Sequence, residues 1–493
     1  MAVEQDDDKT DLVFGASGYI GTNLVEFLAG RNRKVRATSR TLEILEGRGW
    51  DGVELCRADA LEPESLDAAL CGIDTAYYLV HSMAAGKSFP ELDAQAARNF
   101  AEAAARQRVR CIVYLGGLTP KDPRSAHLKS RQETGDILRQ GSVPVTELRA
   151  GMIIGPGSAA WEVIRDLVNH LPVMLTPRWV FSRSTPIALG NLLHYLAEVP
   201  KHGETAGEVY DVAGPDIVTY ADVMRRYGQQ VGKRPVIIPV PVLTPRLSSY
   251  WLRLVTAVPT NIARALIDGL SQDVIASDDR LAALIPQKLL SFDEAAAVAL
   301  DAERQHAVPA RWLESSAAFD NFRPGYSFYS KQADGSTLTQ AEPAAIWSVI
   351  CKVGHDGDYF YARMLWWLRR AIDGTLGGPS LRRSRRHPSQ VRVGDIIDSW
   401  RVIEVVPEER LTLLMEMKAP GAGVLEFRID DRGTEREITV HAYWHPAGVW
   451  GLLYWYATLP IHTALFRGTA RAIARRAAAG VGAAHLSRRA RRS

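Results

Sequence analysis

The stretch Asp11–Gly21, DLVFGASGYIG, decides the fold of the N-terminal half of this chain of 493 residues. A short apolar run ends at Gly15, and glycines recur three and six positions later, at Gly18 and Gly21. Apolar residues then recur at helical spacing over 22–30. This order predicts a strand, a tight glycine turn and a helix.

The three glycines answer three different steric demands. A side chain at Gly15 would block the bend, and one at Gly18 would keep a dinucleotide pyrophosphate away from the backbone. A side chain at Gly21 would hold the helix away from the strand. Because the free amides at a helix N-terminus bind phosphate, we predict dinucleotide binding here; the alternative is an ordinary glycine turn.

The identity of the cofactor depends on the end of the second expected strand, 34–38. Enzymes that select NAD usually place an acidic residue there to accept hydrogen bonds from the ribose. No acid stands at positions 38–40, and Arg40, which follows Ser39, could pair with a 2′-phosphate. We therefore favour NADP(H) over NAD(H); the alternative for Arg40 is a plain surface residue.

Strand-like and helix-like segments alternate through the rest of the first 150 residues. The expected strands cover 53–57, 75–80, 111–115 and 143–148, and the expected helices cover 63–70 and 92–107. The fourth strand is continuously apolar, which a parallel strand covered on both faces requires. The pattern predicts an α/β fold with a doubly wound parallel sheet.

Further motifs give the chain a family resemblance. The Gly15-x-x-Gly18-x-x-Gly21 spacing and the later RAG (149–151) and GPG (155–157) turns resemble extended and atypical short-chain dehydrogenase/reductases, over residues 11 to about 286. The resemblance implies a Rossmann sheet with a small substrate lobe formed by 161–176 and 218–284. It implies cofactor contacts from Gly15, Ser17, Gly18, Tyr19, Ile20, Gly21, Ser39, Arg40, Asp59, Ala60, Leu79, His81 and Arg131.

The usual catalytic set of that family is absent. The fifth strand ends in Gly116-Gly117 where the family has Ser, and HLKSR (127–131) puts His127 and Arg131 at the Tyr and Lys positions. His127 is a candidate acid because histidine titrates near neutrality, and Arg131 or Lys129 could hold the nicotinamide ribose. His81, after the fourth strand, is a second catalytic candidate; the alternative for both histidines is a structural role.

The C-terminal part follows a different pattern. Alternating runs over 396–443 precede a final helix, 452–477, with an interruption expected near Pro460. The stretches PAAIWSVI (343–350), VGDIIDSWRV (393–402) and YWYATLPIH (454–462) resemble an uncharacterised domain of the START and polyketide-cyclase superfamily. This resemblance implies an α+β helix-grip domain around an apolar cavity. Wall candidates, with plain core as the alternative, are Trp366, Trp367, Trp400, Trp444, Trp450, Tyr454 and Trp455.

Composition and charge limit location and partners. Four scattered cysteines suit a reducing compartment and indicate no metal site, and the acidic N-terminus lacks the apolar core of a signal, so we expect a cytoplasmic protein. The net charge is only +3, but arginines are concentrated in two runs, at 382–386 and 488–492. Solvated arginine is the favoured interpretation; because no nucleic-acid module accompanies these runs, we expect no nucleic acid, and contact with anionic membrane lipid is the functional alternative.

One apolar segment of the C-terminal part bears on the membrane. Residues 448–459 lie between Pro446 and Pro460 and are too short for the roughly 20 residues of a membrane span. A buried aromatic helix is the favoured interpretation, and a helix lying at an interface is the alternative.

These patterns together predict two domains and a ranked set of functions. The expected parts are an acidic tail (1–10), a nucleotide-binding domain (11–304), a linker (305–321), a helix-grip domain (322–480) and a basic tail (481–493). The leading hypothesis is an NADP(H)-dependent oxidoreductase or isomerase acting on a small hydrophobic, lipid or quinone-like substrate. Its rivals are a non-catalytic NADP(H)-binding sensor or assembly factor and a hydrophobic-ligand carrier.

Overall fold

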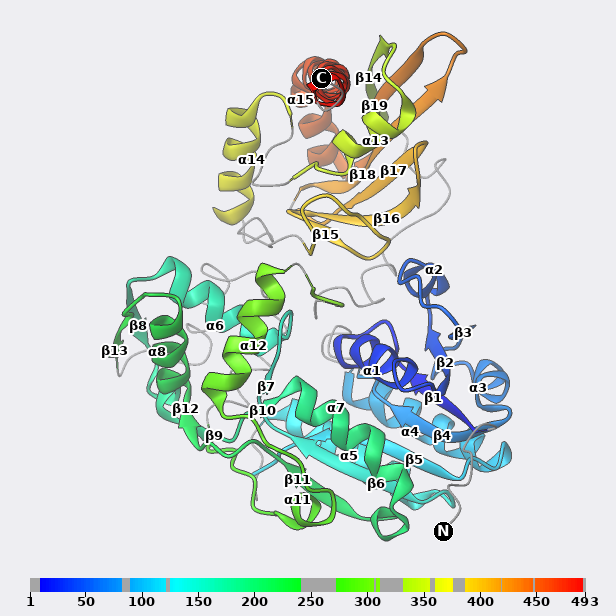
Figure 1. Ribbon diagram of the computed structural model, residues 1–493, viewed down its shortest axis with the longest axis vertical. Helices are drawn as coiled ribbons and strands as arrows, with labels where there is room; N and C mark the ends of the chain where they lie inside the picture. The colour runs from blue at the N-terminus through cyan, green and yellow to red at the C-terminus, as the bar shows by residue number, and fades with distance from the viewer. Residues whose placement is uncertain are drawn as a thin grey trace. The chain divides into compact units, whose positions relative to one another are not determined.

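The chain divides into two compact units, Met1–Ala317 (unit 1) and Ala318–Ser493 (unit 2), and the boundary lies within the segment expected to be a linker. Figure 1 shows this computed structural model as a ribbon. The structure describes residues 9–81, 89–120, 125–240, 272–305, 307–310, 331–354, 360–375, 386–417, 419–446 and 448–490. Each unit is considered by itself.

Unit 1 is built on a seven-stranded parallel sheet with the order β11-β6-β5-β4-β1-β2-β3. Its strands are β1 (Thr10–Phe14), β2 (Lys34–Ser39), β3 (Glu54–Arg57), β4 (Ile73–Tyr78), β5 (Cys111–Gly117), β6 (Val145–Ala150) and β11 (Val209–Val212). The strand order reverses between β1 and β4, so the carboxyl ends of these strands flank a switch point where such sheets bind ligands.

Helices cover both faces of this sheet, as Figure 1 shows. They are α1 (Tyr19–Ala29), α2 (Leu42–Glu46), α3 (Pro63–Leu70), α4 (Phe89–Arg106), α5 (Ala126–Gln140), α7 (Leu189–Glu198) and α11 (Arg280–Leu284). Val13 and Tyr77 point into the core with α1 and α7, whereas Phe14 and Tyr78 point into the core with α3 and α4. The predicted doubly wound Rossmann sheet is confirmed.

A smaller lobe of unit 1 has a core of its own around Trp161, Tyr227 and Phe292. Its helices are α6 (Ala159–His170), η2 (Arg178–Phe181), α8 (Tyr220–Gln230) and α12 (Phe292–Arg304). Its short strands are β7 (Ile153–Ile154), β8 (Val173–Thr176), β9 (Arg183–Ser184), β10 (Ile187–Ala188), β12 (Val218–Thr219) and β13 (Val236–Pro239). The turns η3 (Val199–Lys201) and η4 (Gly203–Thr205) lie beyond α7.

The segment after α12 returns to the body of unit 1. Val308 and Ala310 are buried, and a Cβ at Gly157 would lie 2.4 Å from the Ala310 carbonyl oxygen. Gly157 also has a φ of +83°, so glycine is required there on two grounds. The first residues of the expected linker are therefore packed.

Unit 2 is a six-stranded antiparallel sheet, β14-β19-β18-β17-β16-β15, with a long helix packed on it (Figure 1). The strands are β14 (Lys331–Thr339), β15 (Ile396–Ile397), β16 (Trp400–Val406), β17 (Arg410–Met415), β18 (Gly421–Asp431) and β19 (Arg436–Pro446). The helices are α13 (Pro343–Ile350), α14 (Arg363–Thr375) and α15 (Gly448–Ala490). The predicted antiparallel α+β arrangement is confirmed.

Two predictions for unit 2 are wrong. Helix α15 continues through Pro460 because residues on both sides, such as Trp455 and Phe466, are buried in one core, and this packing outweighs the lost hydrogen bond. Trp367 and Trp450 are 65% and 77% exposed and line no cavity wall. The other wall candidates behave as core: Trp400, Trp444 and Trp455 are buried, and Trp366 and Tyr454 pack against them.

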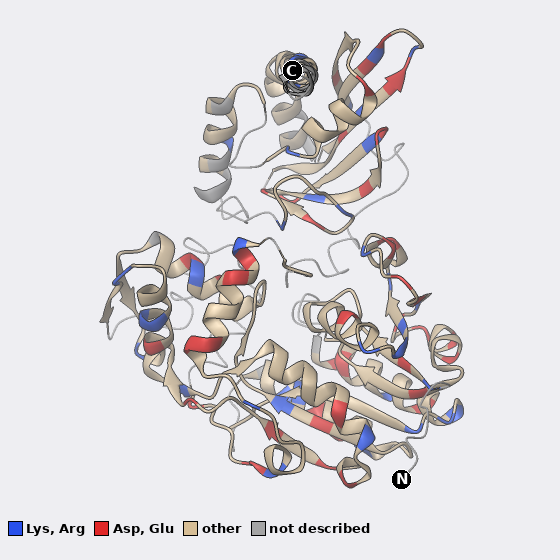
Figure 2. Cartoon of the chain, in the orientation of Figure 1, with Lys and Arg blue, Asp and Glu red and all other residues tan. Residues whose placement is uncertain are grey.

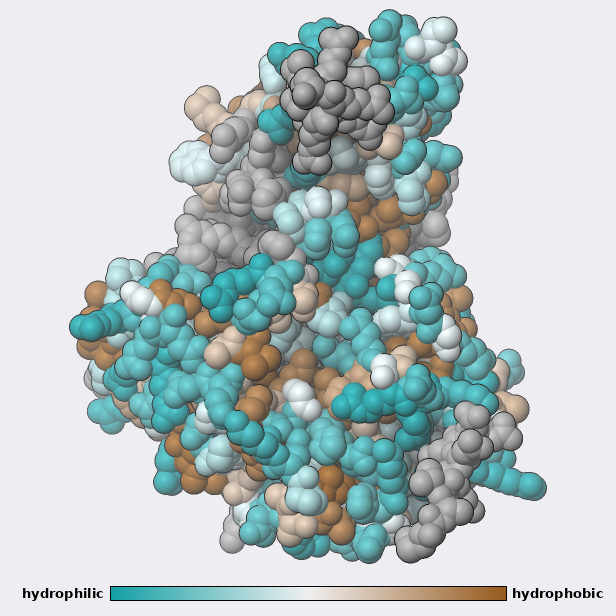
Figure 3. Space-filling view, in the orientation of Figure 1, coloured by the Kyte–Doolittle hydropathy of each residue, from teal (hydrophilic) through white to brown (hydrophobic). Residues whose placement is uncertain are grey.

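Charged residues of both signs are distributed along the described elements of each unit (Figure 2). On the face drawn in Figure 3, hydrophilic residues predominate on unit 1 and enclose smaller hydrophobic areas. Among the helices that the structure describes, none is both long enough and apolar enough to cross a membrane.

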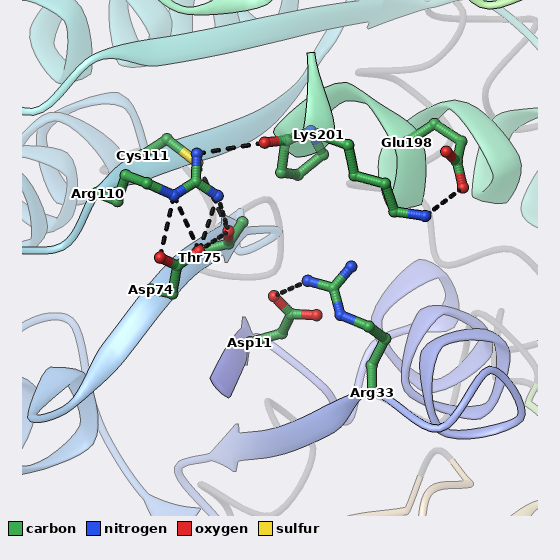
Figure 4. A network of polar contacts seen from close by, with 9 residues as sticks. Asp11, Arg33, Asp74, Thr75, Arg110, Cys111, Glu198 and Lys201 are labelled. Carbon is green, nitrogen blue, oxygen red and sulfur yellow. Dashed lines mark hydrogen bonds and ion pairs between the residues drawn. The ribbon is translucent and has the colours of Figure 1, made fainter. Parts of the chain in front are cut away.

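An ion-pair network ties together the amino ends of the unit 1 strands (Figure 4). The fully buried carboxylate of Asp11 in β1 accepts a hydrogen bond of 2.9 Å from Arg33. Arg110 donates to Asp74 at 2.7 Å and to Thr75 at 3.0 Å, which joins β4 to β5. Burial alone would raise the pKa of Asp74, but Arg110 lowers it below its ordinary value.

Replacing Arg33 tests how much this network contributes. Arg33→Met removes the ion pair between Arg33 and the buried Asp11 carboxylate, so we expect the free energy of unfolding of unit 1 to fall by about 3 kcal/mol. Arg31→Met is the control, because Arg31 lies on the same turn and contacts only the ring and carbonyl of Phe27 among the contacts described. Arg31→Met should lower the free energy of unfolding, measured by urea unfolding, by about 1 kcal/mol or less. Equal losses would contradict this role for Arg33.

Candidate functional site

The glycine turn between β1 and α1 is required by its neighbours. Gly15 has a φ of +94°, and a Cβ there would lie 2.9 Å from Val80 Cγ1. A Cβ at Gly21 would lie 2.2 Å from the Gly15 carbonyl oxygen, so α1 could not approach β1. A Cβ at Gly18 would lie 3.3 Å from the Gly15 carbonyl oxygen, a tight contact that is less severe than those at Gly15 and Gly21.

The N-terminus of α1 has the form of a phosphate site. Its N-cap is Gly18, with no side-chain cap hydrogen bond, and its first turn carries no acidic residue. The turn is held by hydrogen bonds from the Ala16 amide to the Thr38 carbonyl (2.9 Å) and from Thr22 Oγ1 to the Ala16 carbonyl (2.8 Å). Uncapped amides and a bare glycine face fit a dinucleotide pyrophosphate.

A cavity of about 500 Å³ extends from this turn into the smaller lobe. It is lined by Gly18–Gly21, Leu79–His81, Leu115–Leu118, His127, Leu128, Arg131, Ala150–Ile153, Ser158–Ala160, Val163, Ile164, Leu167, Thr176, Pro177, Trp179, Val180, Ser184, Tyr220, Met224 and Val274. The turn and the histidines form one end, and the lobe contributes mainly apolar side chains.

The cavity brings together only part of the cofactor set implied by the family resemblance. Gly18, Tyr19, Ile20, Gly21, Leu79, His81 and Arg131 line it, whereas Gly15, Ser17, Ser39, Arg40, Asp59 and Ala60 do not. Both groups nevertheless belong to the carboxyl edge of the sheet. Ser39 ends β2 and Asp59 follows β3, which are the strands next to β1 on the side away from the cavity.

The two candidate histidines are in direct contact and share a carboxylate. His81 Nδ1 lies 2.6 Å from Asp93 Oδ2, and His81 Nε2 lies 2.7 Å from His127 Nδ1. Ser130 Oγ donates to the same Asp93 oxygen at 2.9 Å. Asp93, Ser130 and His127 are buried. Asp93, His81 and His127 therefore form a buried hydrogen-bonded relay, in that order.

The relay fixes which nitrogens carry protons. An ionised Asp93 only accepts, so His81 Nδ1 donates to it and the neutral His81 ring accepts at Nε2. His127 Nδ1 must then donate to His81, and His127 Nε2 is left with a lone pair. This nitrogen makes no hydrogen bond to any described residue. The relay thus presents a proton acceptor at the cavity.

The electrostatics agree with that assignment. Burial lowers the pKa of His127 to about 2; the neighbouring His81 and the Arg131 cation add to the shift, and Asp93 opposes it. Burial also lowers the pKa of His81, against the hydrogen bond to Asp93. With this pKa the His127 ring is neutral near pH 7, and its role in proton transfer stays a prediction.

Arg131 occupies the cavity wall beside the relay. Its Nη2 donates to the Leu115 carbonyl at the end of β5 (2.6 Å), and its own carbonyl accepts from Tyr114 Oη (2.9 Å). Lys129, the other candidate for the ribose, is exposed and does not line the cavity. Arg131 is therefore the better placed cation.

A buried carboxylate explains why β5 ends in glycine. Glu147, 1% exposed, pairs with Arg139 and with Arg149 Nε, the latter at 2.8 Å. A Cβ at Gly116 would lie 2.7 Å from Glu147 Oε1, and one at Gly135 would lie 2.6 Å from Oε2. Any side chain at 116, including the family's serine, would displace this ion pair.

Adding one methyl group tests this packing. We expect Gly116→Ala to lower the free energy of unfolding by about 1–3 kcal/mol, because rigid neighbours hold the carboxylate in place. Gly190→Ala in α7 is the control, because nothing lies within 4 Å of its Cβ position. It should be neutral or stabilise by up to about 1 kcal/mol. If Gly116→Ala were as stable as the wild type, the Glu147 carboxylate would have room to move, which would contradict this account.

Sequence reasoning missed Asp93, and it predicted the lobe segment 161–176 without naming which of its side chains line the cavity. The sequence placed Asp93 inside an expected helix and gave no sign that it belongs to a site. Only the fold brings its carboxylate to His81. The lobe side chains Ala160, Val163, Ile164 and Leu167 line the cavity from α6. Their helical spacing indicates one apolar side of a helix. The spacing does not show whether that side packs in the core or lines a cavity.

Unit 1 has the fold and the glycine turn that are typical of NAD(P)-binding Rossmann domains. Residues 15–156 match a family described as NAD(P)H-binding, and this range includes the glycine turn and the whole relay. Residues 330–469 of unit 2 match a family described as a protein of unknown function, DUF2867.

Solved structures share the fold of unit 1. Triphenylmethane reductase of Citrobacter sp. superposes with a TM-score of 0.51 at 20% identity, covering 59% of this chain and 99% of that one. Its complex with NADP(H) gives 0.50 at 19% identity, covering 59% and 100%.

One curated protein matches in sequence. Cinnamoyl-CoA reductase 1 of Oryza sativa subsp. japonica is 33% identical over 109 residues, which are 21% of this chain. The match spans about a third (32%) of that relative's length.

Proposed function

We propose that the protein is an NADP(H)-dependent oxidoreductase that acts on a small hydrophobic substrate held in the cavity of unit 1. The observation that carries the proposal is the continuity of this cavity. It joins a helix N-terminus suited to phosphate, a buried proton relay and an apolar lobe in one space.

The residues present fit a nicotinamide dinucleotide, and each has a distinct task. When bound, the cofactor supplies or accepts a hydride. The α1 amides bind its pyrophosphate, and Arg131 binds its ribose. The apolar side chains of α6 and α8 exclude water from the reacting carbon and select a substrate without charge.

The relay handles the proton that accompanies hydride transfer. In the direction of oxidation, His127 Nε2 takes the proton of a substrate hydroxyl. The Asp93 carboxylate, next to His81, partly offsets the cost of placing a positive charge on this buried ring. In the direction of reduction, the same nitrogen returns that proton to the substrate oxygen. The relay thus replaces the tyrosine that this chain lacks.

Disabling the relay is the direct test of catalysis. Asp93→Asn can donate to His81 Nδ1, which reverses both ring tautomers and turns His127 Nε2 from acceptor into donor. We expect turnover to fall by about two to four orders of magnitude, as in His127→Ala, with NADPH affinity unchanged. Ser130→Ala is the control, since it removes one hydrogen bond to Asp93 and leaves the relay in place. Unchanged turnover in Asp93→Asn would exclude the relay from the mechanism.

The pH dependence follows from the same geometry. Burial lowers the pKa of His127 to about 2; of the groups that face it, His81 and Arg131 add to the shift and Asp93 opposes it. The active, unprotonated ring is therefore lost only as the pH falls toward that value. We expect kcat between pH 5 and pH 8 to lack the inflection near 6.5 that an unperturbed histidine gives. Such an inflection, absent in His127→Ala, would contradict this assignment.

The preference for NADP(H) depends on Arg40. It is exposed directly after β2, where a 2′-phosphate would lie, and no acidic residue ends that strand. We expect Arg40→Ala to weaken NADPH binding at least about tenfold and to leave NADH binding nearly unchanged, as measured by fluorescence titration. Arg57→Ala is the control, because Arg57 already pairs with Glu62 at 3.0 Å. Equal losses for both cofactors would contradict the assignment.

A non-catalytic sensor is the second candidate, favoured by the absence of the usual serine, tyrosine and lysine. It predicts tight NADPH binding without oxidation when hydrophobic quinones or carbonyl compounds are added, whereas the oxidoreductase predicts oxidation. For unit 2 we propose a helix-grip domain that holds or delivers the substrate, supported by the packing of α15 on its antiparallel sheet.

A further inference from the structure

Helix α14 of unit 2 has its apolar side turned away from the protein. Met364 and Trp367 are 78% and 65% exposed, and Leu365, Leu368 and Ile372 are exposed as well. At the spacing of an α-helix these five positions fall within less than half of the circumference. We call them the exposed face of α14. A surface helix of a soluble domain normally turns this side to the core.

The opposite side of α14 contacts the body of unit 2. Trp366 packs against the core, and Arg369 Nε lies 3.2 Å from Met417 Sδ. The Arg369 guanidinium also lies 6.0 Å from the ring centre of Tyr454 in α15. The orientation of the helix is therefore set by contacts, and the apolar face is outermost because of them.

The N-terminal part of α15 adds apolar surface to the same unit. Trp450, Leu453 and Tyr456 recur every three residues and are exposed. The sequence favoured a buried helix for this segment and left a helix at an interface as the alternative. The exposure of these three side chains supports the alternative. Aromatic residues with one polar edge are typical of membrane interfaces.

The charge of the surrounding chain identifies the partner. Between positions 363 and 386 the acidic residue is Asp373 alone, and the basic residues are Arg363, Arg369, Arg370, Arg382, Arg383, Arg385 and Arg386. In Figure 2 the coloured part of α14 shows blue and no red. An apolar helix face in an arginine-rich segment is complementary to a bilayer with anionic headgroups.

We propose that the exposed face of α14 inserts into the surface of an anionic lipid bilayer. Trp367 and Leu368 enter the boundary between headgroups and acyl chains, and the net positive charge of the segment 363–386 attracts anionic headgroups. A second copy of this chain fits the face less well. A two-fold axis through α14 would bring two arginine-rich segments together.

Vesicle flotation of the full chain tests the proposal. Wild type should bind vesicles of phosphatidylcholine mixed with phosphatidylglycerol, more weakly at high salt, and bind pure phosphatidylcholine vesicles poorly. Trp367→Ser with Leu368→Ser should weaken binding to the anionic vesicles at least about tenfold. Arg363→Gln with Arg370→Gln should weaken it by a similar factor.

The matched control removes exposed apolar side chains elsewhere. Val298 in α12 and Leu338 in β14 are both more than half exposed, at 58% and 53%. Val298→Ser with Leu338→Ser should bind vesicles as wild type does. The proposal is overturned if wild type does not bind anionic vesicles, or if the Trp367/Leu368 variant binds them as wild type does. It is also overturned if that variant's only effect is to abolish a dimer detected by sedimentation.

Discussion

The close approach of α1 to β1 is the constraint on which the candidate site depends. With only a hydrogen atom at Gly21, the helix starts directly against the Gly15 carbonyl, and its free amides reach the carboxyl edge of the sheet. The β4 and β5 ends meet at the same edge and bring His81, Gly117 and Arg131 beside those amides. One steric requirement therefore determines both where a phosphate binds and which side chains face the reacting end of the cavity.

The loss of the usual catalytic residues has two different physical causes. At position 116 the reason is packing, because the Glu147 carboxylate occupies the space that a serine side chain would need. At position 127 a histidine stands where the tyrosine is expected, and it is held in place by His81, which in turn contacts Asp93. A chain can therefore depart from a family's catalytic motif and still bring a base to the same cavity.

Local patterns in the sequence predicted the parallel sheet, the glycine turn and the antiparallel second unit, because each depends on residues close together in the chain. The contact between His81 and His127 was not predictable in this way, since 46 positions separate them. Asp93 gave no local signal at all. The exposed side of α14 was missed for a related reason: spacing shows that a helix has an apolar side, and only the packing of Trp366 and Arg369 shows which way that side faces.

The packing of Val308 and Ala310 on unit 1 determines where the chain can be divided. A fragment that ended with α12 at Arg304 would uncover the backbone at Gly157 and leave the Arg48 guanidinium without the Pro309 carbonyl, 3.2 Å away. Gly157 lies between β7 and α6, the element that lines the apolar end of the cavity. The integrity of the binding lobe thus depends on four residues, 307–310, beyond the last helix of unit 1.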